Sequence, residues 1–335
     1  MTAAPHAAAD SGTRRVPRAP LCDAFTLTEL LVVIALIVLL VSILLAALGH
    51  VQQKSREVTT LATMQAFSNA CEAFQQEHGF YPGVVPEAIM VSDAAAGSGW
   101  PQISGTENAS LHLLGGFARA ADTEAAVYDQ LADPPWTELS FATPGGGNPY
   151  LVKVDPARLG DGPTISGKPY APYFTPSEKS FGVVEGQQGY GADLPDVLDA
   201  WGQPIIFLRR LRTLGPLAAE IGTTAPPQFE SAAMQPYLQS EGLGSLAQNQ
   251  KKYSVLVTAP DPEAALGRLL QHPALEGQAR GSYLLLSAGA DGIYFSRTDG
   301  AGSPGTPVDD VVSIYADNPN IFGEFDDVVI FGGGE

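Results

Sequence analysis

Phe25-Thr26-Leu27-Thr28-Glu29, followed directly by the apolar segment Leu30–Leu48, is the stretch on which the fold prediction depends. The apolar segment has 19 residues, with one hydroxyl group at Ser42 and no charge. As an α-helix it would extend roughly 28 Å, close to the hydrocarbon thickness of a bilayer. We therefore expect residues 25–48 to form the transmembrane half of a helix. Glu29, at its edge, is a candidate functional residue, because an acid in or near a membrane is costly without a partner.

The helix is predicted to continue as an amphipathic half over residues 49–78. Apolar residues recur there mostly three or four positions apart, on one helical face: Val51, Val58, Leu61, Met64, Phe67, Cys71 and Phe74. Gly79 and Pro82 follow as a helix stop signal. We therefore expect one long helix from about Phe25 to His78, with its first half in lipid and its second half packed on a soluble domain.

Residues 23–35, Asp-Ala-Phe-Thr-Leu-Thr-Glu-Leu-Leu-Val-Val-Ile-Ala, resemble the class III signal of type IV pilins and of type II secretion pseudopilins. The resemblance implies that a prepilin peptidase cleaves between Ala24 and Phe25 and methylates the new amino group of Phe25. Glu29 is then the fifth residue of the mature chain, where the family has an acid. The family usually has glycine in place of Ala24. The implied partner of Glu29 is the methylated ammonium group on a neighbouring subunit, since such a pair is strong in a low dielectric.

The resemblance also implies a location and partners. Residues 1–24 become a cytoplasmic leader that is removed; they contain Arg14, Arg15 and Arg18 but no apolar run of their own, unlike a secretory signal peptide. The mature chain is expected to cross the inner membrane once, with a cytoplasmic amino terminus and a periplasmic carboxyl-terminal domain. Its expected partners are copies of itself in a filament, the prepilin peptidase, other pseudopilins and the inner-membrane assembly platform.

The composition argues against several functional classes. The 335 residues include 18 Lys and Arg against 36 Asp and Glu, a formal charge of -18, which disfavours nucleic acid as a partner. Once the leader with Cys22 is removed, Cys71 is left alone, so neither an internal disulfide nor a cysteine-based metal site is expected. The five histidines are scattered and no Gly-x-Ser-x-Gly motif occurs, so we predict that the protein is not an enzyme.

Beyond the helix, the chain divides into two regions. Residues 79–198 are rich in glycine and proline and are predicted to form an irregular insertion with short helices. Residues 199–335 are predicted to contain a small antiparallel sheet, with strands that begin at Ile205, Tyr253, Tyr283 and Val328. Asp199–Phe207 resembles the Asp-x-Trp-Gly-x-Pro turn of the major pseudopilin. The expected fold class is α+β and pilin-like, with the long helix packed on this sheet.

An acidic turn is the second candidate site. Ser287-Ala-Gly-Ala-Asp291-Gly follows a predicted strand, and Asp326-Asp327 precedes the last one, a pattern that resembles the calcium loop of the major pseudopilin. Carboxylates and backbone carbonyls on glycine-rich turns suit Ca²⁺. The resemblance points first to Asp291 and Asp327, then to Asp326 and Asp299. Asp309–Val312 repeats the later pattern, so either Asp pair could supply the ligands. Asp-Gly pairs also simply make turns.

The leading functional hypothesis is a pseudopilin-like structural subunit that assembles through its amino-terminal helix in a type II secretion system or a related machine. One alternative is a surface type IV pilin for adhesion or motility. Another alternative, from a different class, is a signal-anchored extracytoplasmic enzyme or binding domain built on Pro86–Asp196.

Overall fold

The structure is a computed structural model, and it describes only part of the chain. The described residues are 26–96, 102–183, 194–218, 225–229, 254, 262–296 and 325–334. The predicted leader lies outside them, as do Ala24, Phe25, Asp299 and Asp309–Val312. The chain divides into two compact units, residues Met1–Val51 (unit 1) and Gln52–Glu335 (unit 2), each of which is described by itself below.

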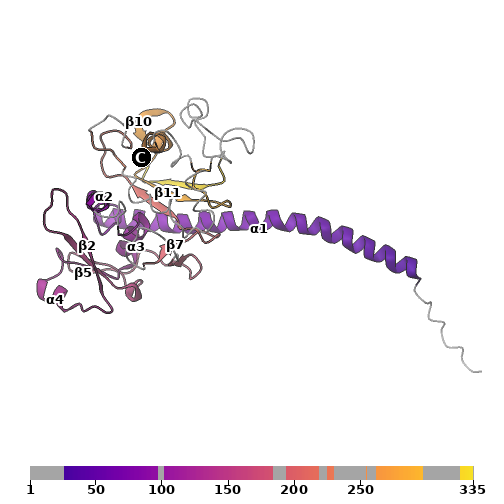
Figure 1. The fold of residues 1–335 in the computed structure, drawn as a ribbon, viewed down its shortest axis with the longest axis horizontal. Helices are drawn as coiled ribbons and strands as arrows, with labels where there is room; N and C mark the ends of the chain where they lie inside the picture. Colours follow the sequence, from indigo (N-terminus) through magenta and orange to yellow (C-terminus); the bar gives the residue numbers. More distant parts are fainter. Residues whose placement is uncertain are drawn as a thin grey trace, which may run out of the picture. The chain divides into compact units, whose positions relative to one another are not determined.

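Helix α1 extends from Leu27 to His78, over 52 residues, and passes from unit 1 into unit 2 (Figure 1). It ends where the sequence supplies a stop. Gly79 takes a left-handed conformation, with φ of 80°, and its N–H donates to the carbonyl of Gln75 at 2.7 Å. Proline at position 82 then prevents the helix from continuing.

The predicted fold class is wrong. The chain forms a mixed α/β structure with several small antiparallel sheets, whereas we expected one small sheet and an irregular insertion. The reason is that the strands are short, two to five residues each, and are separated by glycine and proline turns. Runs of that length give little periodic signal, so residues 79–198 were interpreted as irregular.

The prediction of a transmembrane half is contradicted as well. In the part of the chain that the structure describes, no helix combines the length and the apolar character that crossing a bilayer would require.

The central sheet of unit 2 has the order β12-β11-β8. It consists of β8 (Ile206–Arg209), β11 (Tyr283–Ser287) and β12 (Val328–Gly332), all antiparallel. Strand β11 is buried on both faces. Because successive side chains of a strand point to opposite faces, Tyr283 and Leu285 contribute to one hydrophobic core, and Leu284 and Leu286 to another.

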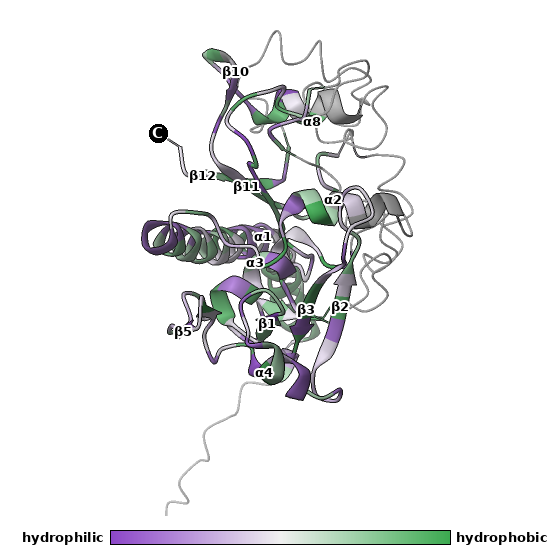
Figure 2. Ribbon diagram, turned by 90° about the vertical axis from the view of Figure 1, so that its left-hand side faces the viewer, coloured by the Kyte–Doolittle hydropathy of each residue, from purple (hydrophilic) through white to green (hydrophobic). Residues whose placement is uncertain are grey.

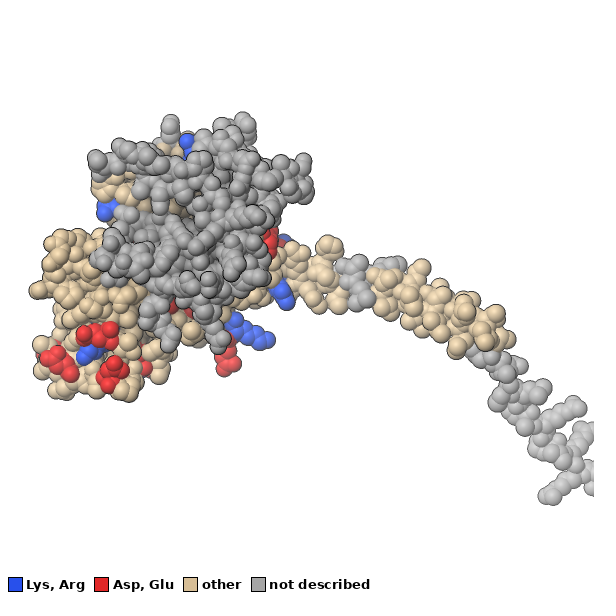
Figure 3. Space-filling view, viewed as in Figure 1, with Lys and Arg blue, Asp and Glu red and all other residues tan. Residues whose placement is uncertain are grey.

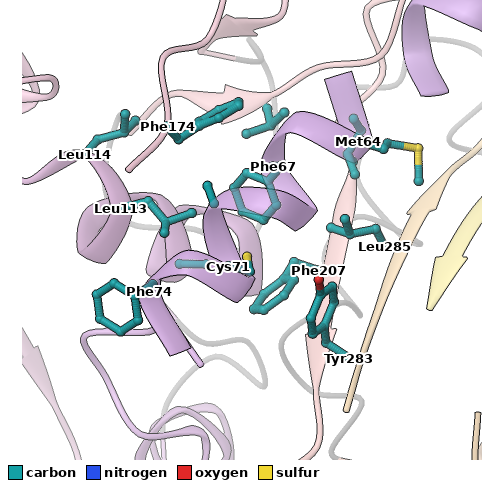
Figure 4. Close-up of a cluster of buried hydrophobic side chains, with 14 of the residues drawn as sticks. Met64, Phe67, Cys71, Phe74, Leu113, Leu114, Phe174, Phe207, Tyr283 and Leu285 are labelled. Carbon is teal, nitrogen blue, oxygen red and sulfur yellow. The ribbon is translucent and has the colours of Figure 1, made fainter. Parts of the chain in front are cut away.

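The first of these cores packs the later turns of α1 against the sheet. Met64, Phe67, Cys71 and Phe74 of α1 lie with Phe207, Tyr283 and Leu285 of the sheet, and Leu113 and Phe174 belong to the same cluster (Figure 4). The ring of Phe67 packs edge-on against that of Phe207, with centroids 5.7 Å apart. The second core lies on the other face of the sheet, where α8 (Pro262–Leu270) packs on β11.

A second sheet forms a separate layer, with the order β1-β3-β2. It contains β1 (Phe117–Arg119), β2 (Thr137–Phe141) and β3 (Tyr150–Val154), again antiparallel. Alternate residues of β2 and β3 are buried, and together with α2 (Glu87–Ala96) they form a third core. The region predicted to be an irregular insertion therefore has a sheet and a core of its own.

Helix α3 (Gly105–Leu114) joins the layers, since it lies between the two sheets (Figure 2). It begins with a capping box, in which Ser104 and Glu107 satisfy each other's backbone N–H groups. The hydroxyl of Thr106 donates to the carbonyl of Ile205 at 2.5 Å and accepts from the N–H of Phe207 at 3.0 Å. These two bonds fix α3 to the start of β8.

The remaining elements of the described residues are short. They are α4 (Ala125–Gln130), the 3₁₀ turn η1 (Pro156–Arg158), and three two-stranded sheets: β4 (Thr164–Ile165) with β5 (Lys168–Pro169), β6 (Phe181–Gly182) with β7 (Asp196–Val197), and β9 (Gln271–His272) with β10 (Leu275–Ala279).

We predict that Phe67→Ala lowers the free energy of unfolding by about 3–5 kcal/mol, because the ring is buried and its loss leaves a cavity. Val58→Ala, on the exposed side of the same helix, is the control and should change it by less than about 0.5 kcal/mol. Urea unfolding of the two variants measures the difference. Equal losses in both would contradict the packing described here.

Candidate functional site

Glu29, the predicted assembly residue, begins α1 as part of a capping box. Its carboxylate accepts hydrogen bonds from the N–H of Thr26 at 2.9 Å and from the hydroxyl of Thr26 at 2.7 Å. In return, the Thr26 hydroxyl oxygen accepts from the N–H of Glu29 at 3.2 Å. The sequence analysis missed this arrangement, although threonine followed three residues later by glutamate is its signature.

The capping box affects the charge of Glu29. The bonds from the Thr26 backbone and hydroxyl favour the ionised carboxylate and lower the pKa of Glu29, although the side chain is fully exposed. A negative charge at this end also interacts favourably with the helix dipole. Glu29 is therefore held ionised at the first turn of α1.

The residues that follow Glu29 carry no charge and are exposed. Every described side chain from Leu30 to Ser42 is exposed, and the large aliphatic ones keep 45–62% of their surface. Figure 3 shows this part of α1 without acidic or basic side chains on the visible face. So large an exposed apolar surface is typical of a site that is covered by a membrane or by another protein.

The acidic turn is brought together by the pairing of β11 with β12. Ser287, the last residue of β11, lies opposite Val328, the first residue of β12. Asp326 and Asp327, just before β12, therefore lie beside the turn that follows β11, which contains Asp291. Asp299 lies outside the described residues.

The carboxylates of this turn hold backbone amides. Asp326 accepts from the N–H groups of Ala290 and Asp291, at 2.9 and 3.1 Å, and Asp327 accepts from the N–H of Phe295 at 3.0 Å. The carboxylate of Asp291 accepts from the N–H of Ile293 at 2.7 Å. Hydrogen bonds to charged groups are worth roughly 1.5–3 kcal/mol, so these bonds stabilise the turn.

The calcium prediction is not tested by this arrangement. Within the described residues, no group of three or more His, Cys, Asp or Glu side chains is arranged to hold a metal ion. The carboxylates of Asp291, Asp326 and Asp327 accept hydrogen bonds from backbone N–H groups, and a Ca²⁺ ion would require six to eight oxygen ligands around one point. Calcium binding therefore stays a prediction from the resemblance.

A buried carboxylate, Asp199, ties the acidic turn to the Asp-x-Trp-Gly-x-Pro turn. One of its oxygens accepts from the N–H groups of Trp201 and Gln203, at 2.8 and 2.9 Å, and the other accepts from the Ser287 hydroxyl at 2.7 Å. Burial raises the pKa of Asp199, and these bonds oppose the rise. The two turns that separately resemble the major pseudopilin are thus one bonded unit, which sequence spacing could not show.

The comparisons with known proteins add no relative. No protein-family model matches this chain, and no curated protein and no solved structure shows significant similarity to it. The residues quoted above are therefore the basis for the functional proposal.

We predict that Thr26→Val raises the pKa of Glu29 toward its ordinary value, because the hydroxyl bond is lost. In the unaltered chain a lowered pKa stabilises the first turn above the unfolded pKa, and that stability is lost as pH falls through the lowered value. An NMR titration of carboxyl-labelled glutamate measures the pKa of Glu29 in each chain. Thr26→Ser, which keeps a hydroxyl group, serves as the control. An identical titration of Glu29 in Val and Ser variants would contradict the capping box.

The calcium prediction is tested by thermal unfolding with CaCl₂ and with EGTA. If calcium binds the folded chain, a hundredfold excess over Kd should add about 2.7 kcal/mol of stability. Asp291→Asn and Asp327→Asn should abolish that gain, while Asp161→Asn, at an exposed acid elsewhere, should not. Equal midpoints in CaCl₂ and EGTA would refute calcium binding and leave the carboxylates as amide acceptors.

Proposed function

We propose that this protein is a pilin-like structural subunit, in the manner of a type II secretion pseudopilin, that assembles through the first half of α1. The observation that carries the proposal is the arrangement of residues at the beginning of α1. An uncharged, exposed aliphatic surface follows directly on Glu29, and both lie just after the proposed cleavage point between Ala24 and Phe25.

Burial of the exposed aliphatic side chains supplies the driving force for assembly. Fully burying one Val, Leu or Ile side chain is worth about 1.5–3 kcal/mol, and the segment from Leu30 to Val41 exposes eleven of them in twelve residues. Neighbouring copies of α1 would cover this surface. We propose that the chain is located at the inner membrane, with its carboxyl-terminal domain outside the cytoplasm.

Glu29 would set the stagger between neighbouring copies. Its carboxylate is held ionised by Thr26, and an ionised carboxylate brought into an apolar contact requires a cation or loses several kcal/mol. The amino group created at Phe25 by cleavage is such a cation, and the chain would carry one at each subunit's amino terminus. Pairing Glu29 with Phe25 of a neighbour would allow one alignment of the helices and penalise others.

The proposed partners follow from this arrangement. They are copies of the same chain, a prepilin peptidase that creates the new terminus, other pseudopilins and an inner-membrane assembly platform. A surface pilin would use the same contacts, and electron microscopy for long external fibres distinguishes the two functions.

Processing is tested by mass spectrometry of the protein purified from its native membrane. We expect a mature amino terminus at Phe25 that carries one additional methyl group on its nitrogen. Ala24→Gly, which restores the residue usual in the family, should be processed at least as fast, and Ala24→Leu much more slowly. A purified chain that retains Met1, or whose amino terminus is a residue other than Phe25, would contradict the proposal.

The role of Glu29 is tested by comparing Glu29→Ala with Thr26→Val. Glu29→Ala removes both the charge and the capping box, whereas Thr26→Val removes only the hydroxyl of the capping box. We expect at least a tenfold loss of chemically cross-linked multimers for Glu29→Ala and less than a twofold loss for Thr26→Val.

Glu57→Ala is the matched control, because Glu57 is another acid on α1 whose partner, Lys54, lies on the same helix. It should leave the multimers unchanged. Equal effects of Glu29→Ala and Glu57→Ala, or an equal loss in Thr26→Val, would show that the Glu29 charge is not what aligns the subunits.

A further inference from the structure

An open hollow of about 530 Å³ lies in unit 2, beside the central sheet, where the chain leaves β8. Residues 210–214 form most of its lining, and Tyr81 and Ser282 form the rest. The lining contains Arg210 and Arg212 and, among the residues that the structure describes, no acid. The whole chain has twice as many acids as bases, so this hollow is a locally basic surface on an acidic protein.

The loop that forms the hollow is held in place by hydrogen bonds. The N–H of Leu211 donates to the carbonyl of Gln228 at 2.8 Å, and the side-chain amide of Gln228 donates to the carbonyl of Gly215 at 2.8 Å. The Nη1 of Arg212 donates to the carbonyl of Pro227 at 2.6 Å. Because these bonds tie residues 211–215 to residues 227–228, the shape of the hollow is fixed by the fold.

Leu214 and Arg210 are available to a partner at this hollow. Leu214 keeps 82% of its surface exposed, although it belongs to the bonded loop. Arg210 is half-buried, and its guanidinium group forms no hydrogen bond or ion pair with the described residues. Arginine and tyrosine are enriched in protein interfaces, and Tyr81 lines the same hollow. These features are typical of a surface that another protein covers.

The surface around α4 has the complementary features. Val127 keeps 49% of its surface exposed, and Glu124 lies three positions before it, so the two share one side of the helix. Asp129 and Asp133 are exposed as well. Figure 3 shows acidic side chains gathered over this part of the chain. An apolar side chain among carboxylates matches a hollow lined by leucine and arginine in both polarity and charge.

The bases beside α4 do not cancel this acidic charge. Arg119 forms an ion pair with Asp122, and the Nζ of Lys153 donates to the carbonyls of Tyr128 and Leu131, each at 2.9 Å. The carboxylates of residues 124, 129 and 133 form no hydrogen bond or ion pair with the described residues. They therefore stay open to a cation on another molecule.

We propose that the hollow binds the α4 surface of a second copy of this chain, with Val127 and Glu124 of one copy against Leu214 and Arg210 of the next. The hollow borders the central sheet, whereas α4 is bonded to β3 through Lys153, so two different surfaces meet. Such a contact leaves one hollow and one α4 surface open at the two ends, and it can extend to further copies.

This contact deepens the assembly of copies proposed above and rests on it, but it uses neither α1 nor Glu29. Exposed ion pairs are individually weak, and they weaken further as salt screens them. The contact is therefore one that aligns subunits already gathered in a membrane or filament.

Disulfide cross-linking of two differently tagged full-length chains in native membranes tests the proposal. One chain carries Leu214→Cys and the other Val127→Cys; both positions are exposed, and Cys71 is buried. Because the two surfaces differ, we expect about tenfold more mixed dimers than dimers of either chain with itself. Val183→Cys, at a residue that is 51% exposed and outside both surfaces, is the matched control and should not cross-link to Leu214→Cys.

The charges are tested by adding Arg210→Glu to the chain with Leu214→Cys. We expect the yield of mixed dimers to fall about tenfold, since the reversed charge now faces carboxylates. Glu124→Arg with Asp129→Arg in the other chain should restore most of the yield. Lys179→Glu makes the same change of net charge at an exposed residue elsewhere and should leave the yield unchanged.

Leu36→Cys reports the α1 contact separately from this one. Dimers through Leu36→Cys without mixed dimers of the Leu214→Cys and Val127→Cys chains would overturn this proposal and leave assembly through α1 standing. Mixed dimers without dimers through Leu36→Cys would support it and contradict assembly through α1. A mixed yield no higher than that of the Val183→Cys control, equal yields from Leu214→Cys alone, or no recovery with the reversed partner would each overturn the proposal.

Discussion

The contact between the later turns of α1 and strand β11 is the constraint on which the rest of unit 2 depends. Met64 and Phe67 pack on Tyr283 and Leu285, and the hydroxyl groups of Ser68 and Tyr283 lie 2.7 Å apart. This contact positions β11, which in turn aligns β8 and β12 through its two edges. The acidic turn and the Asp-x-Trp-Gly-x-Pro turn then meet at one end of the sheet, where Asp199 bonds to Ser287.

The sequence predicted the parts of the fold that carry a long or strong pattern. The predicted strand starts at Tyr283 and Val328 are confirmed, and the predicted start at Ile205 lies one residue before the observed one. The β1-β3-β2 sheet was missed, although Leu139 and Phe141 alternate with polar residues in β2. Such short strands between glycine and proline turns are stabilised by tertiary contacts, which no local pattern reveals.

The candidate sites, like the fold, could be predicted from the sequence only in part. The position of Glu29 near the start of a helix could be predicted, and its capping box with Thr26 was visible in the spacing but went unrecognised. That Asp326 and Asp327 lie beside Asp291 followed from the resemblance, yet their amide partners depend on the β11–β12 register.

The most direct test of the account is disulfide cross-linking between copies of the first half of α1. Single cysteines at successive positions from Leu30 to Val41 would be oxidised in native membranes, while Cys71 is buried and contributes little background. The account predicts covalent dimers whose yield rises and falls with the helical period of 3.6 residues, because each copy presents a fixed face to its neighbour. Monomers at every position, or a yield that is the same at all of them, would contradict assembly through α1.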